Sequence, residues 1–398
     1  MMLGVAHRAW RLLPRAARRA AMTRVAAMIA VPPDPAPANS DGAIIAGDTD
    51  GKNGIAESGR ILGRALAARG LLRGTMPLGL PSVVPAFAGT LPPRAAVISV
   101  VNGPFLPVGL ARLTPRDILR DRRMIGVWAW ELPGVPPEWA VGARFVHEIW
   151  APTRFAADAF EPVAPGRVRV VPFPLACELP FEMTGDRASF GLPADCFVVL
   201  SIFNLASSCA RKNPFGTIAA FRAAFGTRLD ALLVLKLTGV AHYPDDLAAI
   251  RAVIGDAPNI RVITETVSEP ALRGLIATSD VVLSLHRSEG FGLIPATAAL
   301  LGVPVVATGF SGTLDFMDEA ASGLVRYRLV QARDDRGSYD IPGAVWADPD
   351  IEDAADWLTR LFDDTALRTR LGAAGQRHAM AKLGRDPLDA ALAASGIS

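Results

Sequence analysis

Short apolar runs alternate with helical patterns along most of the chain, and this alternation limits the fold more than any other feature. Apolar runs that fit strands lie at 43–46, 96–101, 124–129, 148–151 and 168–171, then at 197–202, 231–237, 259–263, 281–285 and 303–307. Helical patterns separate the second set, at 214–225, 244–254, 270–278 and 294–301. Such alternation is typical of parallel α/β sheets. We therefore predict an α/β protein with two Rossmann-like, doubly wound domains.

Two stretches of irregular composition divide the chain. Residues 31–41 are rich in Pro, Ala, Asn and Ser and predict a linker, and the Pro-rich stretch 172–193 interrupts the α/β pattern. We expect ordered structure to start at Ile44. The predicted parts are a basic extension and linker over 1–40, an N-terminal Rossmann-like domain over 41–180, a C-terminal Rossmann-like domain over 181–375 and a helical tail over 376–398. Doubly wound domains bind ligands in a crevice at the carboxyl ends of their strands.

Charge and composition exclude several classes of protein. The net charge of +2 gives no global signal for nucleic acid, and the three cysteines form neither a disulfide framework nor a metal knuckle. The simplest compartment is the cytoplasm. The first 33 residues contain many Arg and no Asp or Glu, with Arg8, Arg11, Arg15 and Arg18 at helical spacing around Pro14. The favoured interpretation is a solvated basic extension, and peripheral contact with an anionic membrane is the alternative. A signal peptide fits less well, because the apolar stretch 25–31 is short.

The segment 286–295 joins a carboxylate to two glycines directly after an apolar strand. Gly290 and Gly292 let backbone N–H groups approach a ligand, and the helix that follows favours negative charge at its start. Glu289, at the exit of the strand, can accept hydrogen bonds from sugar hydroxyls. An ordinary turn with a solvated glutamate is the alternative.

This segment resembles the signature of family 4 (group 1) retaining glycosyltransferases, which have the GT-B fold. The resemblance lies in Ser-Glu-Gly-Phe-Gly-Leu at 288–293, followed by Gly-Val-Pro-Val-Val-Ala-Thr at 302–308. The stretches 128–133, 211–214 and 309–317 resemble a bacterial branch of that family. In all, the resemblance runs from about 44 to about 377. It implies two Rossmann-like domains facing across a crevice that holds a nucleotide sugar.

The resemblance also implies roles for individual residues. Glu289 is expected to hold the transferred sugar and Lys212 to stabilise the departing diphosphate, so these two are the predicted catalytic residues. Donor contacts are expected from Arg211, Gly290, Phe291, Gly292, Leu293, Thr297 and Thr264. Gly54 and Glu131 are expected to contact the acceptor or a phosphate, Trp130 to stack on a sugar, and His147 to be structural. The pair Asp48 and Asp50 fits a polar loop, so no metal site is predicted.

Three positions stand apart from the resemblance. The family motif has a second glutamate where this chain has Thr297, which leaves a catalytically degenerate protein as an alternative. The more upstream arginine of the family is not evident, and Asn204 lies near its expected place. Lys236 interrupts an apolar strand, where a lysine either extends to solvent or faces a polar site.

The predicted function is metal-independent, retaining transfer of a hexose, such as mannose, from a GDP- or UDP-linked donor. A glycan or glycolipid acceptor, polysaccharide biosynthesis and a location at the inner face of the membrane complete the prediction. No cofactor beyond the nucleotide-sugar co-substrate is expected, and no nucleic acid partner. The alternatives are a non-catalytic glycosyltransferase-like partner subunit, a GT-B epimerase acting on a free nucleotide sugar, and a membrane-docked assembly subunit.

Overall fold

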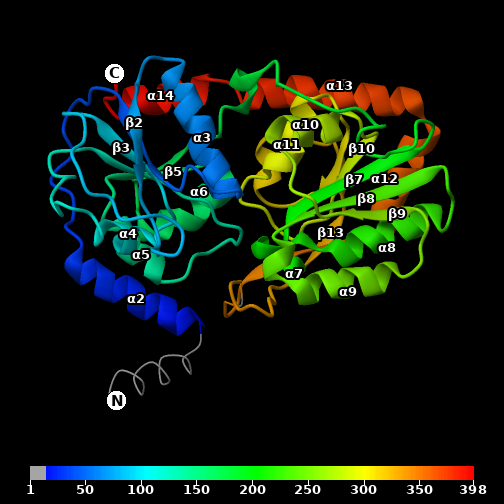
Figure 1. Cartoon of the computed structure of the whole chain (residues 1–398), viewed down its shortest axis with the longest axis horizontal. Helices are drawn as coiled ribbons and strands as arrows, with labels where there is room; N and C mark the ends of the chain where they lie inside the picture. The colour runs from blue at the N-terminus through cyan, green and yellow to red at the C-terminus, as the bar shows by residue number, and fades with distance from the viewer. Residues whose placement is uncertain (1–14, 340) are drawn as a thin grey trace. The chain divides into compact units, whose positions relative to one another are not determined.

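The computed structural model describes residues 15–339 and 341–398, and the chain divides into two compact units (Figure 1). Unit 1 comprises the described residues up to Pro174 together with Arg385–Ser398, and unit 2 comprises Leu175–Gly384. The unit boundary falls inside the predicted connection and close to 180/181. The predicted tail over 376–398 is wrong as a separate part, because its first residues complete a helix of unit 2 and its last ones pack in unit 1.

Unit 1 is built on a six-stranded parallel sheet in the order β2-β1-β3-β4-β5-β6. The strands are β1 (Ala43–Gly47), β2 (Leu72–Pro77), β3 (Ala96–Val100), β4 (Met124–Val127), β5 (Glu148–Ala151) and β6 (Val168–Val170). The helices that accompany them are α3 (Gly54–Ala67), α4 (Leu106–Leu110), α5 (Glu138–Ala143), α6 (Arg154–Phe160) and α14 (Asp386–Ala394). Every residue of β1, β3, β4 and β5 is buried, which explains their continuous apolar runs.

A helix precedes the first strand, so the prediction that structure starts at Ile44 is wrong. This helix, α2 (Arg15–Ile29), packs against α4 and α5. Arg19 donates a 2.8 Å hydrogen bond to Glu138, and the buried hydroxyl of Thr23 donates to the carbonyl oxygen of Pro104 at 2.8 Å. Part of the predicted extension is therefore built into unit 1. The earlier part of the basic pattern, at 8–14, lies outside the described residues.

Unit 2 is built on a second six-stranded parallel sheet, in the order β12-β11-β10-β7-β8-β9. Its strands are β7 (Phe197–Asn204), β8 (Ala231–Thr238), β9 (Ile260–Ile263), β10 (Val281–Ser284), β11 (Val305–Thr308) and β12 (Gly323–Val325). In the numbering of unit 2 alone this order is 3-2-1-4-5-6, that of the Rossmann fold. The order reverses between β7 and β10, so the loops that leave these two strands flank the expected ligand position.

Helices cover both faces of the second sheet (Figure 1). The helices α8 (Pro214–Phe225), α9 (Pro244–Ile254) and α12 (Ile351–Asp363) contribute to one apolar core with the odd-numbered residues of β8. The helices α10 (Glu269–Ala277) and α11 (Leu293–Leu300) cover the other face, and α13 (Thr365–Lys382) packs against α11 and α12. An antiparallel hairpin of β13 (Tyr327–Gln331) and β14 (Val345–Pro349) follows β12.

Candidate functional site

The two adjacent cations of the sequence, Arg211 and Lys212, end a short helical turn, α7 (Cys209–Lys212), which follows β7. The turn is flanked by two residues in the left-handed region, Ser208 with φ +70° and Asn213 with φ +52°. The Ser208 hydroxyl accepts the Arg211 N–H, and the Asn213 amide donates to a backbone carbonyl just after β10. Fixing both ends of the turn directs its cations towards the loop that leaves β10.

Both cations meet Glu289, which lies in that loop. The Lys212 ammonium donates to Oε1 of Glu289, and a guanidinium nitrogen of Arg211 lies 3.1 Å from Oε2. Glu289 is only 7% exposed, and its own N–H donates to the Ser311 hydroxyl at 2.8 Å. Arg211 is more deeply buried than Lys212 and also donates to the carbonyl oxygen of Ser288 at 2.7 Å. The structure thus brings three predicted site residues together at the point where the strand order reverses.

The charges around Glu289 keep it ionised. Burial by itself would raise the pKa of this carboxyl, but the positive charges of Lys212 and Arg211 and the hydrogen bond from Lys212 outweigh burial. They hold the pKa of Glu289 well below its ordinary value. A carboxyl in this state accepts hydrogen bonds and cannot act as a general acid at neutral pH.

A histidine that the sequence analysis did not assign lies beside this cluster. His286 is 1% exposed, and its Nδ1 lies 3.0 Å from the hydroxyl of Ser284. Burial, opposed by the charge of Glu289 but assisted by those of Lys212 and Arg211, lowers the pKa of His286 from 6.5 to about 4. The ring is therefore neutral at pH 7. Its place directly at the strand exit was the available signal, but a single buried histidine after a strand has many structural explanations.

The glycine loop brings backbone towards the start of α11. Gly292 precedes the helix with φ +95°, and a Cβ there would lie 2.7 Å from a methyl carbon of Thr313. Glycine is therefore required at this position. Phe291 is buried against Phe316, with ring centroids 5.3 Å apart, and Leu293 is the first residue of α11. The predicted glycine-loop residues thus form one turn that ends on a helix N-terminus.

The β13–β14 hairpin and its loop hold this cluster in place. The sequence analysis did not predict this hairpin. Asp334 is buried and accepts a 2.8 Å hydrogen bond from the Ser208 hydroxyl that caps α7. Arg287 donates to the carbonyl oxygen of Ala210 at 2.9 Å and lies 3.2 Å from a carboxylate oxygen of Asp348. Because these bonds tie β14 and the 332–344 loop to both site loops, the positions of Lys212 and Glu289 depend on them. The segment carries no family motif that would have marked it.

The remaining predicted residues of unit 2 lie on separate elements. Thr264 directly follows β9, and its N–H donates to a carboxylate oxygen of Glu265 at 3.0 Å. Thr297 is half-buried in α11. Asn204 ends β7, and its side chain turns back to accept the N–H of Ala206 at 2.8 Å. The donor contacts of Thr264 and Thr297 stay predictions.

The predicted residues of unit 1 lie at its strand exits. Gly54 begins α3, where the Asn53 side chain caps the helix, and the loop before it is held by Arg60 through two backbone carbonyls. Glu131 follows β4 and is half-buried. Trp130 is buried, donates to the carbonyl oxygen of Gly134 and packs edge-on against another tryptophan, so its predicted stacking on a sugar does not fit this packing.

Two predictions about polar residues of unit 1 are confirmed. His147 is structural, because its Nδ1 accepts the Met124 N–H at 2.8 Å while Nε2 lies 2.7 Å from the carbonyl oxygen of Asp34. Asp48 belongs to a polar loop in which its carboxylate accepts the N–H of Gly51 at 2.9 Å.

Comparison with known proteins supports a transferase family for the second unit. A family model described as "Family 4 Glycosyltransferase in conflict systems" matches residues 217–383. The D-inositol 3-phosphate glycosyltransferase of Arthrobacter sp. (strain FB24) is 30% identical over 200 residues, which are 49% of this chain and 41% of that protein. The protein of the same name from Nocardioides sp. (strain ATCC BAA-499 / JS614) is 28% identical over 221 residues, or 52% and 44% of the two chains. The chain thus spans less than half the length of these curated relatives.

Solved structures share the architecture over most of the chain. Anabaena Alr3699/HepE in complex with UDP and glucose matches with a TM-score of 0.60 and 15% identity, over 89% of this chain and 99% of that one. A glycosyltransferase from Rickettsia africae ESF-5 matches with a TM-score of 0.64 and 11% identity, over 89% and 98%. At these identities the likeness concerns the fold alone. It identifies the chain as a protein of the GT-B fold, and the family match over residues 217–383 shows that its second unit is similar to family 4 glycosyltransferases.

Proposed function

We propose that the protein is a retaining hexosyltransferase that moves a sugar from a nucleotide-sugar donor to a glycan or glycolipid acceptor in polysaccharide biosynthesis. The observation that carries this proposal is the cluster of Lys212, Arg211 and Glu289 at the reversal of strand order in unit 2. Doubly wound sheets bind nucleotides at that point. The N-terminus of α11 beside the cluster adds backbone N–H groups that suit a phosphate.

The charges suggest a division of labour. Lys212, the more exposed cation, stabilises the departing nucleoside diphosphate, and the ionised Glu289 accepts hydrogen bonds from hydroxyls of the transferred sugar. Two cations at Glu289 reduce its power as a nucleophile, which disfavours a covalent glycosyl intermediate on this carboxylate. We therefore expect the acceptor oxygen to bond the anomeric carbon on the face that the diphosphate leaves, while the acceptor proton passes to the departing phosphate oxygen. This route retains the anomeric configuration.

Arg211 has a different role in this scheme from the donor contact expected from the sequence. Its side chain donates to the carbonyl oxygens of Ser207 and Ser288 and pairs with Glu289. We propose that it positions Glu289, while the direct donor contacts come from Lys212 and from the backbone at 290–293. Because Lys212 already supplies positive charge at the leaving group, turnover should need neither a metal nor an organic cofactor.

A non-catalytic partner subunit is the second candidate, and Thr297 is the observation that favours it. A threonine hydroxyl offers the ribose an uncharged and shorter partner than glutamate. The loss of one charge-assisted bond weakens donor binding by about 1.5–3 kcal/mol, which lowers affinity without removing the cluster at Glu289. An active enzyme with modest donor affinity is therefore the better interpretation.

The test is a screen of UDP- and GDP-linked hexoses, with GDP-mannose among them, in the presence of a chelator. Glu289→Ala and Lys212→Ala are run beside Lys382→Ala, which removes an exposed lysine from the end of α13. Release of nucleotide from one donor that is lost in the first two variants and kept in the third supports the proposal. Binding without turnover for every donor and acceptor would move the non-catalytic partner to first place. A new nucleotide sugar formed without acceptor would indicate an epimerase.

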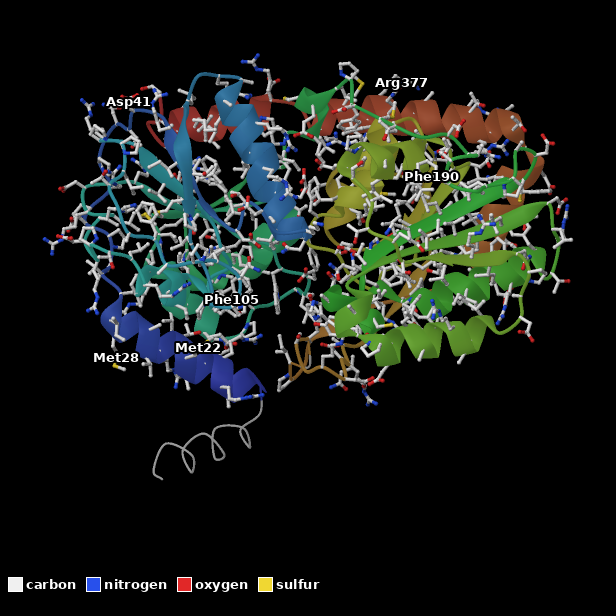
Figure 2. The ribbon with its side chains drawn as sticks, in the orientation of Figure 1. Met22, Met28, Asp41, Phe105, Phe190 and Arg377 are labelled. Carbon is white, nitrogen blue, oxygen red and sulfur yellow. The ribbon has the colours of Figure 1, made fainter. Side chains whose placement is uncertain are left out.

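We also propose that α2 contacts an anionic membrane surface, which would place the protein at the inner face of the cytoplasmic membrane. Its outer face exposes Val25, Met28 and Ile29 beside Arg24, and Met28 is 79% exposed. The side chain of Met28 points away from the rest of unit 1 (Figure 2). Apolar side chains among cations on one helix face suit the boundary between headgroups and acyl chains. Over the described residues, none of the helices is both long and apolar enough to cross a bilayer, so this contact would be peripheral.

Vesicle sedimentation tests this contact with substitutions, because deleting α2 would uncover α4 and α5. We expect the double variant Val25→Ser/Met28→Ser to bind vesicles with anionic lipid less than the unchanged protein does. Val83→Ser, at another exposed apolar residue of unit 1, is the matched control. Equal binding by all three proteins would count against α2 as the contact, and equal binding to purely zwitterionic vesicles would count against the role of charge.

A further inference from the structure

Lys236 is a buried cation that the proposed reaction does not yet use. It lies near the end of β8 and is 1% exposed. Among the described residues, its one hydrogen bond is a long contact of 3.4 Å from Nζ to the carbonyl oxygen of Leu237. An ammonium carries three donors, and an unpaired buried charge is costly. Burial lowers the pKa of Lys236, while the charge of Glu265 acts against that shift.

The alternation of side chains along β8 places Lys236 on the face of the sheet opposite the core formed with α8, α9 and α12. Leu233 and Leu235 belong to the apolar core formed with α8, α9 and α12. Lys236 therefore lies on the opposite face, which α10 and α11 cover, and it pairs in register with Ile202 of β7 and Ile263 of β9. It thus stands between the strand that leads to Lys212 and the strand that leads to Thr264.

The order of the strands matches the order of the chemical groups in a nucleotide sugar. Adjacent strands β10, β7, β8 and β9 lead to or carry Glu289, Lys212, Lys236 and Thr264. In the proposed function, Glu289 holds the sugar and Lys212 the adjoining phosphate. The family resemblance predicts a donor contact at Thr264, and we assign the nucleoside to the loop that begins there. The group between the last two is the phosphate next to the nucleoside. Three strand spacings are about 14 Å, a length comparable to that of an extended nucleotide sugar.

The balance of charge in the site also favours a contact between Lys236 and a phosphate. Arg211 and Lys212 already share the negative charge of Glu289, so together the three side chains leave a net charge of +1 for a diphosphate that carries at least two negative charges. Lys236 would add a further positive charge, which the nearby charge of Glu265 offsets in part. A buried ammonium with one weak acceptor lowers stability by itself, and such a residue is explained when a ligand supplies its counter-charge.

We propose that Lys236 binds the phosphate next to the nucleoside in the donor, as a second phosphate-binding cation beside Lys212. This assignment rests on the proposed function and adds a residue and a division between the two phosphates. Lys212 contacts the phosphate that carries the sugar, and Lys236 contacts the one that carries the nucleoside.

The test compares Lys236→Met with Lys212→Met in the full chain. Calorimetry measures affinity for the nucleoside, its monophosphate and its diphosphate, in the uridine and guanosine series. We expect Lys236→Met to weaken the monophosphate and the diphosphate by about 10-fold or more, and to leave the affinity for the nucleoside unchanged. Lys212→Met should weaken the diphosphate more than the monophosphate. Without ligand, Lys236→Met should melt at a higher temperature than the unchanged protein, because it removes the buried charge.

The outcomes separate this assignment from the proposed function. If Lys212→Met weakens the diphosphate and Lys236→Met leaves both nucleotides unaffected, the role of Lys236 is wrong and the donor site stands. If the unchanged protein binds no nucleotide of either series, the role of Lys236 and the proposed donor site are both wrong. Lys236→Gln, which keeps a donor on a similar chain length, is the second variant should the methionine variant fail to fold. An equal loss of affinity for the nucleoside in that variant would indicate a structural role and overturn the assignment.

Discussion

Replacing His286 should change the pH dependence of folding in a predictable direction. In the folded protein, burial beside two cations lowers the pKa of His286 from 6.5 to about 4. Between these values the unfolded chain binds a proton that the folded chain does not, so the free energy of unfolding falls as pH falls. The gap of about 2.5 pKa units (6.5 minus 4) corresponds to a loss of about 3 kcal/mol in the free energy of unfolding. This loss is complete below pH 4 and absent above pH 6.5.

The variant His286→Gln removes this titration and keeps a hydrogen-bonding group near Ser284. Urea unfolding of both proteins at several pH values from about 7.5 to about 4 gives the difference in stability at each pH. Any cost of repacking appears at every pH, whereas the histidine contribution changes with pH. We expect the free energy of unfolding of the variant, relative to that of the unchanged protein, to rise by about 3 kcal/mol as pH falls from 6.5 to 4. A constant difference would refute a depressed pKa and the desolvated site that causes it.

Three further changes test the structure around the site. Glu289→Gln should lower the free energy of unfolding at pH 7 by about 3 kcal/mol, because it leaves the buried Arg211 and the half-buried Lys212 without their counter-charge. Since the folded pKa of Glu289 is lowered, that difference, followed by urea unfolding, should be full above the unfolded pKa near 4.5 and shrink as pH falls below it. Gly292→Ala should lower the free energy of unfolding of unit 2 by about 1–3 kcal/mol, because φ at this position is +95° and Thr313 blocks a Cβ. Thermal melting measures the loss. Thr23→Val should cost about 1 kcal/mol through the lost bond to Pro104, and hydrogen exchange should show the loss in unit 1 alone.

The buried central strands were predictable because burial on both faces leaves a continuous apolar run. β5 begins and ends at the predicted residues, and α8 and α9 have the predicted bounds, each with a proline at its start. β2 was missed because only one of its residues is buried and its sequence shows no apolar run. The C-terminal residues were misassigned because helical periodicity shows that α14 forms but does not show which unit it packs against.

Some residues of the candidate site could be predicted from local sequence, whereas others enter the site only through contacts between distant parts of the chain. Glu289 and the glycine loop were found because local sequence carries them, and Lys212 because the stretch 211–214 resembles a family motif. What surrounds them was not found: the buried Asp334 reaches the cap of α7 from more than a hundred residues away along the chain. Contacts over that separation leave no pattern in one sequence. Lys236 was noticed as an interruption of a strand, and its burial was needed to decide between the two explanations.

The contact between Lys212 and Glu289 leads to an opposite effect of one substitution on binding and on turnover. The carboxylate of Glu289 accepts a hydrogen bond from the Lys212 ammonium, the group that the donor diphosphate is proposed to bind. A nucleoside diphosphate must therefore share Lys212 with an anion already in place. Glu289→Gln frees the ammonium and removes a negative charge, so it should bind nucleoside diphosphate about 10-fold more tightly than the unchanged protein. The same variant should turn over donor at least about 100-fold more slowly, because it loses the carboxylate that orients the sugar.

Calorimetry with the diphosphate and a turnover assay with the nucleotide sugar measure the two effects on one protein. The prediction concerns the nucleotide product, which lacks the sugar, so loss of sugar contacts does not enter the binding measurement. Weaker binding in Glu289→Gln would mean that the carboxylate orders Lys212 for the phosphate and does not compete for it. Tighter binding with slower turnover would show that Glu289 restrains product affinity, and that the ion pair closes again over Lys212 once the nucleotide has left.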